Sequence, residues 1–211
     1  MKKYGIILFI YFQSILIGMG VDISLGNAFN FNQDLSIDRK NSDDVYFNAK
    51  FKTNGFKSPH YYSVRFTDLL KNNIEFEFIH HKLYVKDNLP EQIDKFEVSD
   101  GYNLLMMNYK YALNESFNIR IGLGTVVTHP DIIIEGETNY IQGGGLFPRF
   151  WTDGYHWGGL SSQIAILLCT PLSDSIKFNL ESKLVYANTI IPIVDGSFNL
   201  PNLSNHILFG L

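Results

Sequence analysis

Cysteine is almost absent from this sequence, since Cys169 is the only one, and a chain with one cysteine forms no internal disulfide. Long apolar runs are also missing. After the first twenty residues, no apolar segment approaches the roughly 20 residues that a transmembrane helix requires. If the rest of the chain lies in a membrane, helices do not place it there.

Basic residues are too few for a nucleic-acid-binding surface. The chain has 17 lysines and arginines against 21 acidic residues, a net charge of −4. Two of the lysines, Lys2 and Lys3, belong to the N-terminal segment, and without them the count is 15 against 21. Phosphate binding requires a basic surface, so we expect no nucleic acid partner.

The N-terminal segment 1–20 has the layout of a secretory signal peptide. Lys2 and Lys3 precede the apolar run GIILFIYFQSILIG, and Gly18 and Gly20 occupy the small positions of a cleavage site. An N-terminal membrane anchor is the alternative, but the apolar core is short and Gln13 interrupts it. No cysteine lies at the cleavage point, which disfavours a lipoprotein. We predict a signal peptide over 1–20 and one domain over 21–211.

The remaining sequence alternates between apolar and polar residues with period 2, which predicts strands. In IEFEFIHHKLYV (74–85), one row holds Ile74, Phe76 and Phe78, and the other begins with Glu75 and Glu77. The pattern predicts eight strands, at about 21–32, 60–69, 73–85, 101–113, 116–128, 158–170, 175–190 and 203–211. Short turns alternate with the longer connections 33–59, 86–100, 129–157 and 191–202.

A soluble β-sandwich would also show alternating strands, but three features disfavour it. The predicted strands are longer than the roughly 5–6 residues usual in soluble proteins. Their apolar rows end in aromatic residues, and their polar rows carry charges of both signs, which a sandwich core does not bury easily. A transmembrane barrel inverts the polarity, with the apolar row facing lipid. We therefore predict an all-β fold, an eight-stranded antiparallel transmembrane β-barrel with long loops on one side.

This architecture resembles that of the small eight-stranded outer-membrane barrels of the OmpA and OmpX type. The resemblance covers the chain after residue 20 and rests on the signal, the strand count and the alternating loop lengths. The last strand, NHILFGL, alternates like the C-terminal assembly signal of that group but ends in Leu211 instead of an aromatic residue. The resemblance implies an outer-membrane protein of a Gram-negative bacterium, monomeric, surrounded by lipid and lipopolysaccharide and inserted by the barrel-assembly machinery through its C-terminal strand.

Charged residues on the inner rows predict a paired plug inside the barrel. The predicted interior cluster consists of Glu75, Glu77, Arg65, Lys110, Arg120, Glu181 and Lys183. Pairing is expected because an unpaired buried charge costs several kcal/mol. A proton- or ion-conducting path is the alternative, although eight strands leave little room for a pore.

His80 and His81 are adjacent in the sequence and therefore point to opposite faces of the strand. His81 is expected to point inward, and His80 and Lys82 are expected to point outward near the outer-leaflet interface. Barrel enzymes that deacylate lipid A resemble this chain in size and carry a His-x-Ser pair, but Lys82 occupies the serine position here. Lipid A palmitoyltransferases resemble it in using rim residues, for which Ser99 and Asp100 are the candidates. The alternative is that His80, His81 and Lys82 are interfacial side chains with amphipathic tips.

The remaining histidines and the glycine-rich segment give little support for a metal-binding or phosphate-binding site. His129, His156 and His206 have no ligand partner at metal-site spacing, so we expect no metal and no cofactor. The segment GGGLFPRFWTDGYHWGG (143–159) lacks the order of a phosphate loop and is expected to be an external loop. The sequence thus favours a structural or interaction barrel, with a lipid A-modifying acyl hydrolase or acyltransferase as the alternative and a narrow channel ranked last.

Overall fold

The computed structural model describes residues 20–68, 73–85, 89–138, 154–173, 176–194 and 196–210. The predicted signal segment lies outside the described residues except for Gly20, which begins the first strand. The described elements are all strands. Within these ranges, no helix is long and apolar enough to cross a membrane.

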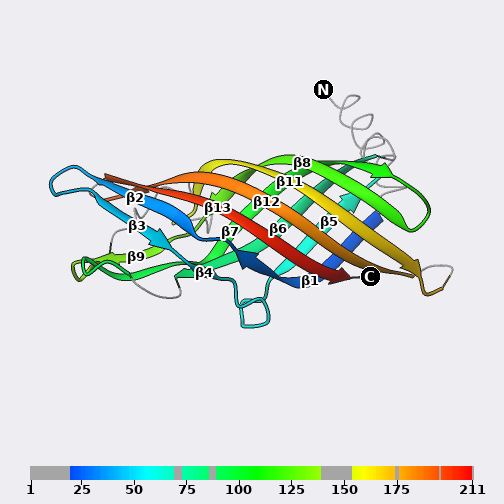
Figure 1. Cartoon of the computed structure of the whole chain (residues 1–211), viewed down its shortest axis with the longest axis horizontal. Helices are drawn as coiled ribbons and strands as arrows, with labels where there is room; N and C mark the ends of the chain where they lie inside the picture. The colour runs from blue at the N-terminus through cyan, green and yellow to red at the C-terminus, as the bar shows by residue number, and fades with distance from the viewer. Residues whose placement is uncertain are drawn as a thin grey trace, which may run out of the picture.

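Eight strands close into a ring in which each strand pairs with two neighbours (Figure 1). In ring order they are β1 (Gly20–Asn30), β5 (Tyr62–Thr67), β6 (Ile74–Val85), β7 (Ile93–Ala112), β8 (Phe117–Thr128), β11 (His156–Pro171), β12 (Lys177–Ile193) and β13 (Gly196–Gly210). Every pair is antiparallel, and β1 closes the ring by pairing with both β5 and β13. The predicted eight-stranded barrel is confirmed.

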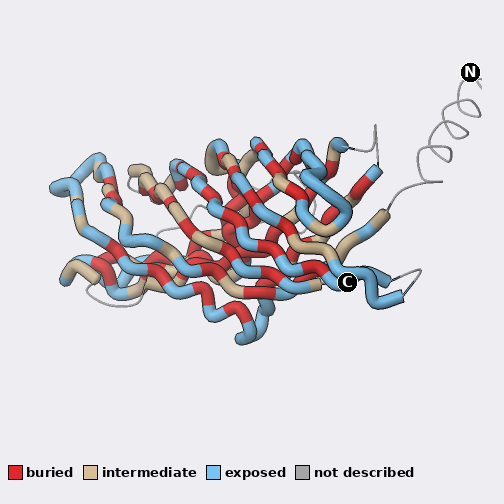
Figure 2. The backbone as a smooth tube through the Cα atoms, turned by 45° about the vertical axis from the view of Figure 1, so that its right-hand side comes forward, coloured by how far each residue is buried: buried red, intermediate tan, exposed pale blue. Residues whose placement is uncertain are grey.

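The two faces of the barrel wall have opposite polarity. Large apolar side chains lie outside, with Leu123 68% and Leu160 79% exposed, whereas Arg65, Glu75 and Lys183 are buried inside. Figure 2 shows the resulting alternation of buried and exposed residues along the strands. A water-soluble protein buries its apolar residues and exposes its charges. The inverted arrangement is that of a barrel whose outer surface contacts lipid.

Beyond the ring, the wall continues into what we call the distal lobe, at the end opposite the short turns. It consists of β2 (Gln33–Arg39), β3 (Val45–Ala49), β9 (Asp131–Ile134), β10 (Glu137–Thr138) and the distal ends of β7, β12 and β13. β2 extends the sheet from β13, and β9 extends it from β7. The segments predicted as long loops 33–59, 86–100 and 129–157 therefore contain strands.

The prediction of a long loop at 191–202 is wrong, because β12 and β13 continue as one hairpin paired from Asn188–Pro201 to Ile193–Gly196. Proline cannot donate a ladder hydrogen bond, and both Pro192 and Pro201 lie within this hairpin. Each proline, however, has a strand partner on one side only. The pairing of β12 with β11 ends at Thr189, and Pro201 lies between the stretches of β13 that pair with β2 and with β1.

The distal lobe has an apolar core between two layers of strands. The buried side chains are Leu35 and Ile37 of β2, Ile191 and Ile193 of β12, and Phe198 and Leu200 of β13 on one side, and Ile93, Phe96 and Val98 of β7 with Ile132 and Ile134 of β9 on the other. The rings of Phe96 and Phe198 stack across the core at 4.5 Å. At the tip, Arg39 donates two hydrogen bonds of 3.2 Å to the Glu135 carboxylate. The lobe is therefore a packed unit that closes the distal end.

One barrel strand is interrupted. β4 (Phe51–Lys52) and β5 both pair with β1 on one side and with β6 on the other, so they occupy the same place in the wall. Between them the chain leaves the wall as residues 53–61, which we call the wall loop; it projects beside β4 and β1 in Figure 1. Phe56 of this loop stacks on the outward-facing Phe209 at 6.3 Å. The middle of the wall loop therefore lies on the outer surface of the barrel.

Two contacts hold the wall loop against the wall. Lys82 Nζ donates hydrogen bonds to the carbonyl oxygens of Asn54 at 3.1 Å and Lys57 at 2.7 Å. The backbone N–H of Gly55 donates to Asn27 Oδ1 at 2.9 Å. Only glycine fits at position 55, because a Cβ there would lie 2.2 Å from the carbonyl oxygen of Gly26. A lipid-facing loop needs such pairing, since lipid supplies no partner for backbone polar groups.

Candidate functional site

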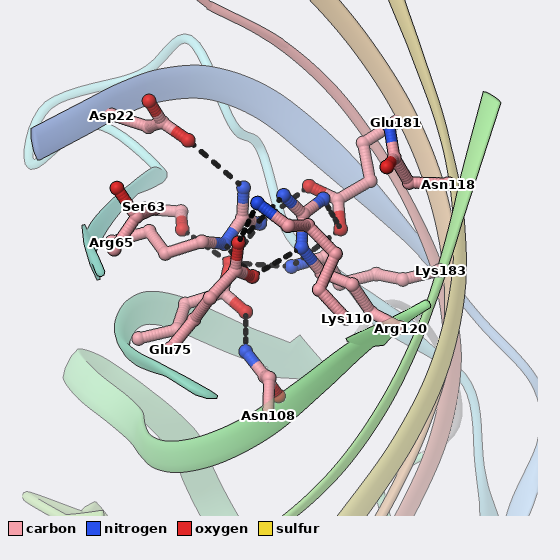
Figure 3. Close-up of polar contacts among 12 residues, drawn as sticks. Asp22, Ser63, Arg65, Glu75, Asn108, Lys110, Asn118, Arg120, Glu181 and Lys183 are labelled. Carbon is pink, nitrogen blue, oxygen red and sulfur yellow. Dashed lines mark hydrogen bonds and ion pairs between the residues drawn. The ribbon is translucent and has the colours of Figure 1, made fainter. Parts of the chain in front are cut away.

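Inward-facing side chains of five strands meet in the barrel interior as one charge cluster (Figure 3). Arg65 of β5 and Glu77 of β6 are cross-strand neighbours, as are Lys110 of β7 and Arg120 of β8. Glu181 and Lys183 follow on the inner row of β12. The structure thus brings together all seven residues of the cluster expected from the sequence.

The ion pairs in this cluster are short and shared. Arg65 lies 2.8 Å from Glu77 and 2.5 Å from Glu181. Arg120 lies 2.5 Å from Glu75 and 3.4 Å from Glu181. Remaining contacts link Lys183 to Glu77 at 2.6 Å, Lys110 to Glu75 at 3.3 Å, and Arg65 to Asp22 of β1 at 3.7 Å. With Asp22 included, the four basic groups face four carboxylates, so the cluster is electrically balanced.

Glu77 is the centre of the cluster. Its Oε1 accepts hydrogen bonds from Ser63 at 2.6 Å, Arg65 at 2.8 Å and Lys183 at 2.6 Å. Its Oε2 accepts from Asn108 at 3.0 Å and Gln163 at 2.8 Å. A carboxylate has about four lone-pair sites, so Glu77 has no free acceptor for a migrating proton. The arrangement therefore favours the interpretation as a fixed plug and disfavours a proton-conducting path.

The sequence did not single out Asp22, Ser63, Asn108 or Gln163 as members of this cluster. Each is an inward-facing residue of its strand, as the alternation shows. The signal that could have found them is therefore the inner row itself. A balanced interior needs one more acid than the seven predicted residues supply, and Asp22 on β1 is that acid.

Above the charge cluster, toward the distal lobe, lies a layer of buried aromatic and histidine side chains. His81 of β6 and His206 of β13 have ring centroids 4.8 Å apart. His206 shares hydrogen bonds with the Tyr61 hydroxyl at 2.7 Å and the Ser204 hydroxyl at 2.8 Å, one through each ring nitrogen. His81 Nε2 contacts Asn30 Oδ1 at 3.2 Å. No spacing in the sequence links His206 to another histidine, and the ring of strands brings it beside His81.

The four candidate catalytic residues have separate partners. His80 Nδ1 contacts Asn103 Oδ1 at 2.8 Å, and its ring stacks on Tyr62 at 5.2 Å. Ser99 Oγ donates to Glu97 at 3.3 Å, and Asp100 lies 3.6 Å from His129. Across the described ranges, no hydrogen bond or ion pair joins Ser99 or Asp100 to His80 or His81. The structure therefore supplies no assembled nucleophile and base at these positions.

The surroundings of His80 and Lys82 also differ from expectation. Both belong to the outer row of β6, as the alternation predicts, but His80 is 8% exposed and Lys82 is fully buried. Tyr62 covers His80, and the wall loop covers Lys82. The expectation that these side chains meet lipid directly is wrong, because sequence periodicity does not show a loop folded over the outer face.

Two further expectations concern metals and the glycine-rich segment. In the part of the chain that the structure describes, no group of three or more histidine, cysteine, aspartate or glutamate residues is arranged to hold a metal ion. Most of the segment 143–159 lies outside the described residues. Its described end, Gly154 to Gly159, leads into β11.

Comparisons with known proteins find similarity in structure only. No protein-family model matches the chain, and no curated protein does. The attachment invasion locus protein Ail of Yersinia pestis is 9% identical, with a TM-score of 0.40, over 90% of this chain and 97% of that one. The outer membrane protein OprG of Pseudomonas aeruginosa is 16% identical, with a TM-score of 0.43, over 90% and 94%. The outer membrane protein AlkL is 12% identical, with a TM-score of 0.42, over 91% and 87%.

Proposed function

We propose that this protein is an outer-membrane β-barrel of structural or interaction type, which displays the distal lobe as a rigid external surface. The observation that carries this function is the continuity of β7, β12 and β13 from the barrel into the packed lobe. Because the same strands form both parts, the membrane anchor fixes the orientation of the lobe. The charge-balanced plug below it suits an anchor better than a conduit.

The enzyme alternative is weaker on this structure. A general base must lie within hydrogen-bond reach of its proton donor, directly or through one water. His81 is enclosed by Tyr61, Tyr102 and His206, and Ser99 and Asp100 contact other residues. A lipid A-modifying activity of these four residues therefore has no geometric support.

Labelling of intact cells tests the proposed topology. In a Cys169→Ser background, Tyr46→Cys in the distal lobe should react with a membrane-impermeant maleimide on intact cells, because the Tyr46 side chain is exposed there. Lys177→Cys, at the short-turn end, is the matched control and should react only after the outer membrane is permeabilised. The reverse pattern, or equal labelling at both positions, would contradict the proposal.

The salt bridge at the tip of the lobe predicts a pH dependence. The hydrogen bonds from Arg39 hold the pKa of Glu135 below its ordinary value of 4.5. A carboxyl whose pKa is lower in the folded state stabilises that state above its unfolded pKa, and this stabilisation is lost as the pH falls through the folded pKa. Amide exchange in β9, corrected for the intrinsic rate, should therefore accelerate below about pH 4. Arg39→Gln should remove this acceleration, and a variant that keeps it would show that another group is responsible.

A further inference from the structure

A groove of about 830 Å³ opens on the barrel wall between β1 and residues 50–57. The residues that line it include Phe29, Lys50, Lys52, Phe56 and Lys57. It exists because the wall is interrupted here, where β4 ends and the wall loop leaves the sheet before β5 begins. The candidate catalytic residues His80, His81, Ser99 and Asp100 do not line it.

The groove is strongly basic in a chain that is acidic overall. No acidic residue occurs between Asp44 and Asp68, although the net charge of the chain is −4. Lys50, Lys52 and Lys57 are all exposed. Within the described residues, none of the three forms an ion pair, whereas Lys95, Lys110 and Lys183 do. Three lysines therefore line the groove, and within the described residues none of them is paired with a carboxylate.

The same groove is bordered by apolar side chains of the membrane-facing surface. Phe29 on the outer row of β1 is 61% exposed, and Phe56 of the wall loop is 63% exposed. Phe56 rests on Phe209, which continues the apolar outer face of β13. The groove therefore places lysine side chains beside aromatic rings, and these rings continue onto the apolar outer face. Such a combination matches the boundary between lipid headgroups and acyl chains.

The groove is also preformed. The wall loop that carries Phe56 and Lys57 is fastened by the buried Lys82 ammonium, which donates to the Asn54 and Lys57 carbonyl oxygens, and by the hydrogen bond from Gly55 to Asn27. A ligand therefore does not have to order the loop when it binds, which favours affinity.

From these observations we infer that the groove binds the phosphate group of an outer-leaflet glycolipid. A phosphomonoester carries a charge of about −1.5 to −2 at neutral pH, which three ammonium groups can neutralise. Phe29 and Phe56 would contact the acyl chains of the same molecule. The inference rests on the proposed outer-membrane placement. A phosphorylated glycolipid of the outer leaflet can reach the groove only if the protein lies in that membrane with the groove at the outer leaflet.

Native mass spectrometry of the folded full-length barrel in detergent can test the inference, with bisphosphorylated lipid A and a dephosphorylated lipid A of the same acylation as probes. The phosphorylated form should bind more tightly. Lys52→Gln combined with Lys57→Gln should weaken that binding about 30-fold, given about 1 kcal/mol for each lysine near an anionic lipid surface. The dephosphorylated form should bind both proteins equally. Retention of the folded form on unboiled gels verifies that the variant is intact.

The matched control is Lys40→Gln combined with Lys177→Gln, which removes the same charge from two exposed lysines outside the groove. It should leave the affinity unchanged. Equal weakening in the control, or equal binding of the two lipids, would overturn the inference. Competition by millimolar inorganic phosphate would show an anion site without a lipid requirement and would overturn the commitment to lipid. None of these outcomes depends on the cell-labelling pattern, so failure of the groove and failure of the proposed topology can be told apart.

Discussion

Replacing Arg65 with alanine is expected to lower the free energy of unfolding by about 3–5 kcal/mol. The guanidinium is buried and contacts Glu77 and Glu181 directly, so its removal leaves the cluster with an excess of negative charge in the barrel interior. Urea unfolding in lipid vesicles, followed by tryptophan fluorescence, measures the change. Lys40→Ala, which removes an exposed lysine, should change stability by less than about 1 kcal/mol.

A double-mutant cycle separates pairing from simple loss of packing. Arg65→Met combined with Glu181→Met removes one charge of each sign and restores the balance of the cluster. The double variant should therefore be clearly more stable than the sum of the two single losses predicts. Strictly additive losses would show that Arg65 and Glu181 do not stabilise each other, despite the 2.5 Å contact between them.

The charge cluster could be predicted because it depends on a local rule. Neighbouring residues of a strand point to opposite faces, so the sequence assigns Glu75, Glu77 and Arg120 to the inner row without knowledge of the ring. The barrel itself followed from the same rule, since charged inner rows and apolar outer rows leave no other stable arrangement in a membrane. Which acid pairs with which base was not predictable, because Glu181 reaches Arg65 across the interior and not along a strand pair.

The layer of buried aromatic and histidine side chains could not be predicted from the alternation of residues along single strands. His81 and His206 lie far apart in the sequence, and their contact depends on the register of the ring and on Tyr61, which the end of the wall loop places inside the barrel. The position of Ser99 and Asp100 was misjudged for a related reason. β7 begins at Ile93 and carries an irregularity opposite His81 to Leu83, so these residues belong to a strand and not to a rim loop.

The wall loop could be predicted as a loop but not as a cover for the outer face. Its sequence, TNGFKSPHY (53–61), contains asparagine, glycine and proline, which are common in loops. Its location depends on Gly55 lying against the Gly26 carbonyl and on Lys82 reaching two carbonyl oxygens. Lys82 was expected at the interface because an exposed lysine is normal there. Its actual role as a buried donor appears only when the strand and loop are folded together.

Lys82→Met is expected to release the wall loop and to destabilise the barrel by about 1–3 kcal/mol. Methionine keeps the unbranched apolar stem, but it removes the donor of the Lys57 carbonyl oxygen and leaves the Asn54 carbonyl oxygen with only the Lys57 N–H at 3.0 Å. An unsatisfied group beside lipid costs about 1–3 kcal/mol. A Phe56→Trp reporter follows the loop, because Phe56 rests on the lipid-facing Phe209. Brominated acyl chains should quench the reporter in the parent protein and much less in Lys82→Met.

Lys177→Met is the matched control, since it makes the same chemical change at an exposed lysine of the short-turn end. Quenching of the Phe56→Trp reporter should be the same in Lys177→Met as in the parent protein. The comparison also bears on the groove, because Lys57 and Phe56 reach it only while the loop is fastened. Lys82→Met should therefore weaken the binding of phosphorylated lipid A although Lys82 itself is buried beneath the loop. Undiminished quenching together with undiminished binding in Lys82→Met would show that the wall loop is held by Gly55 and Phe56 alone.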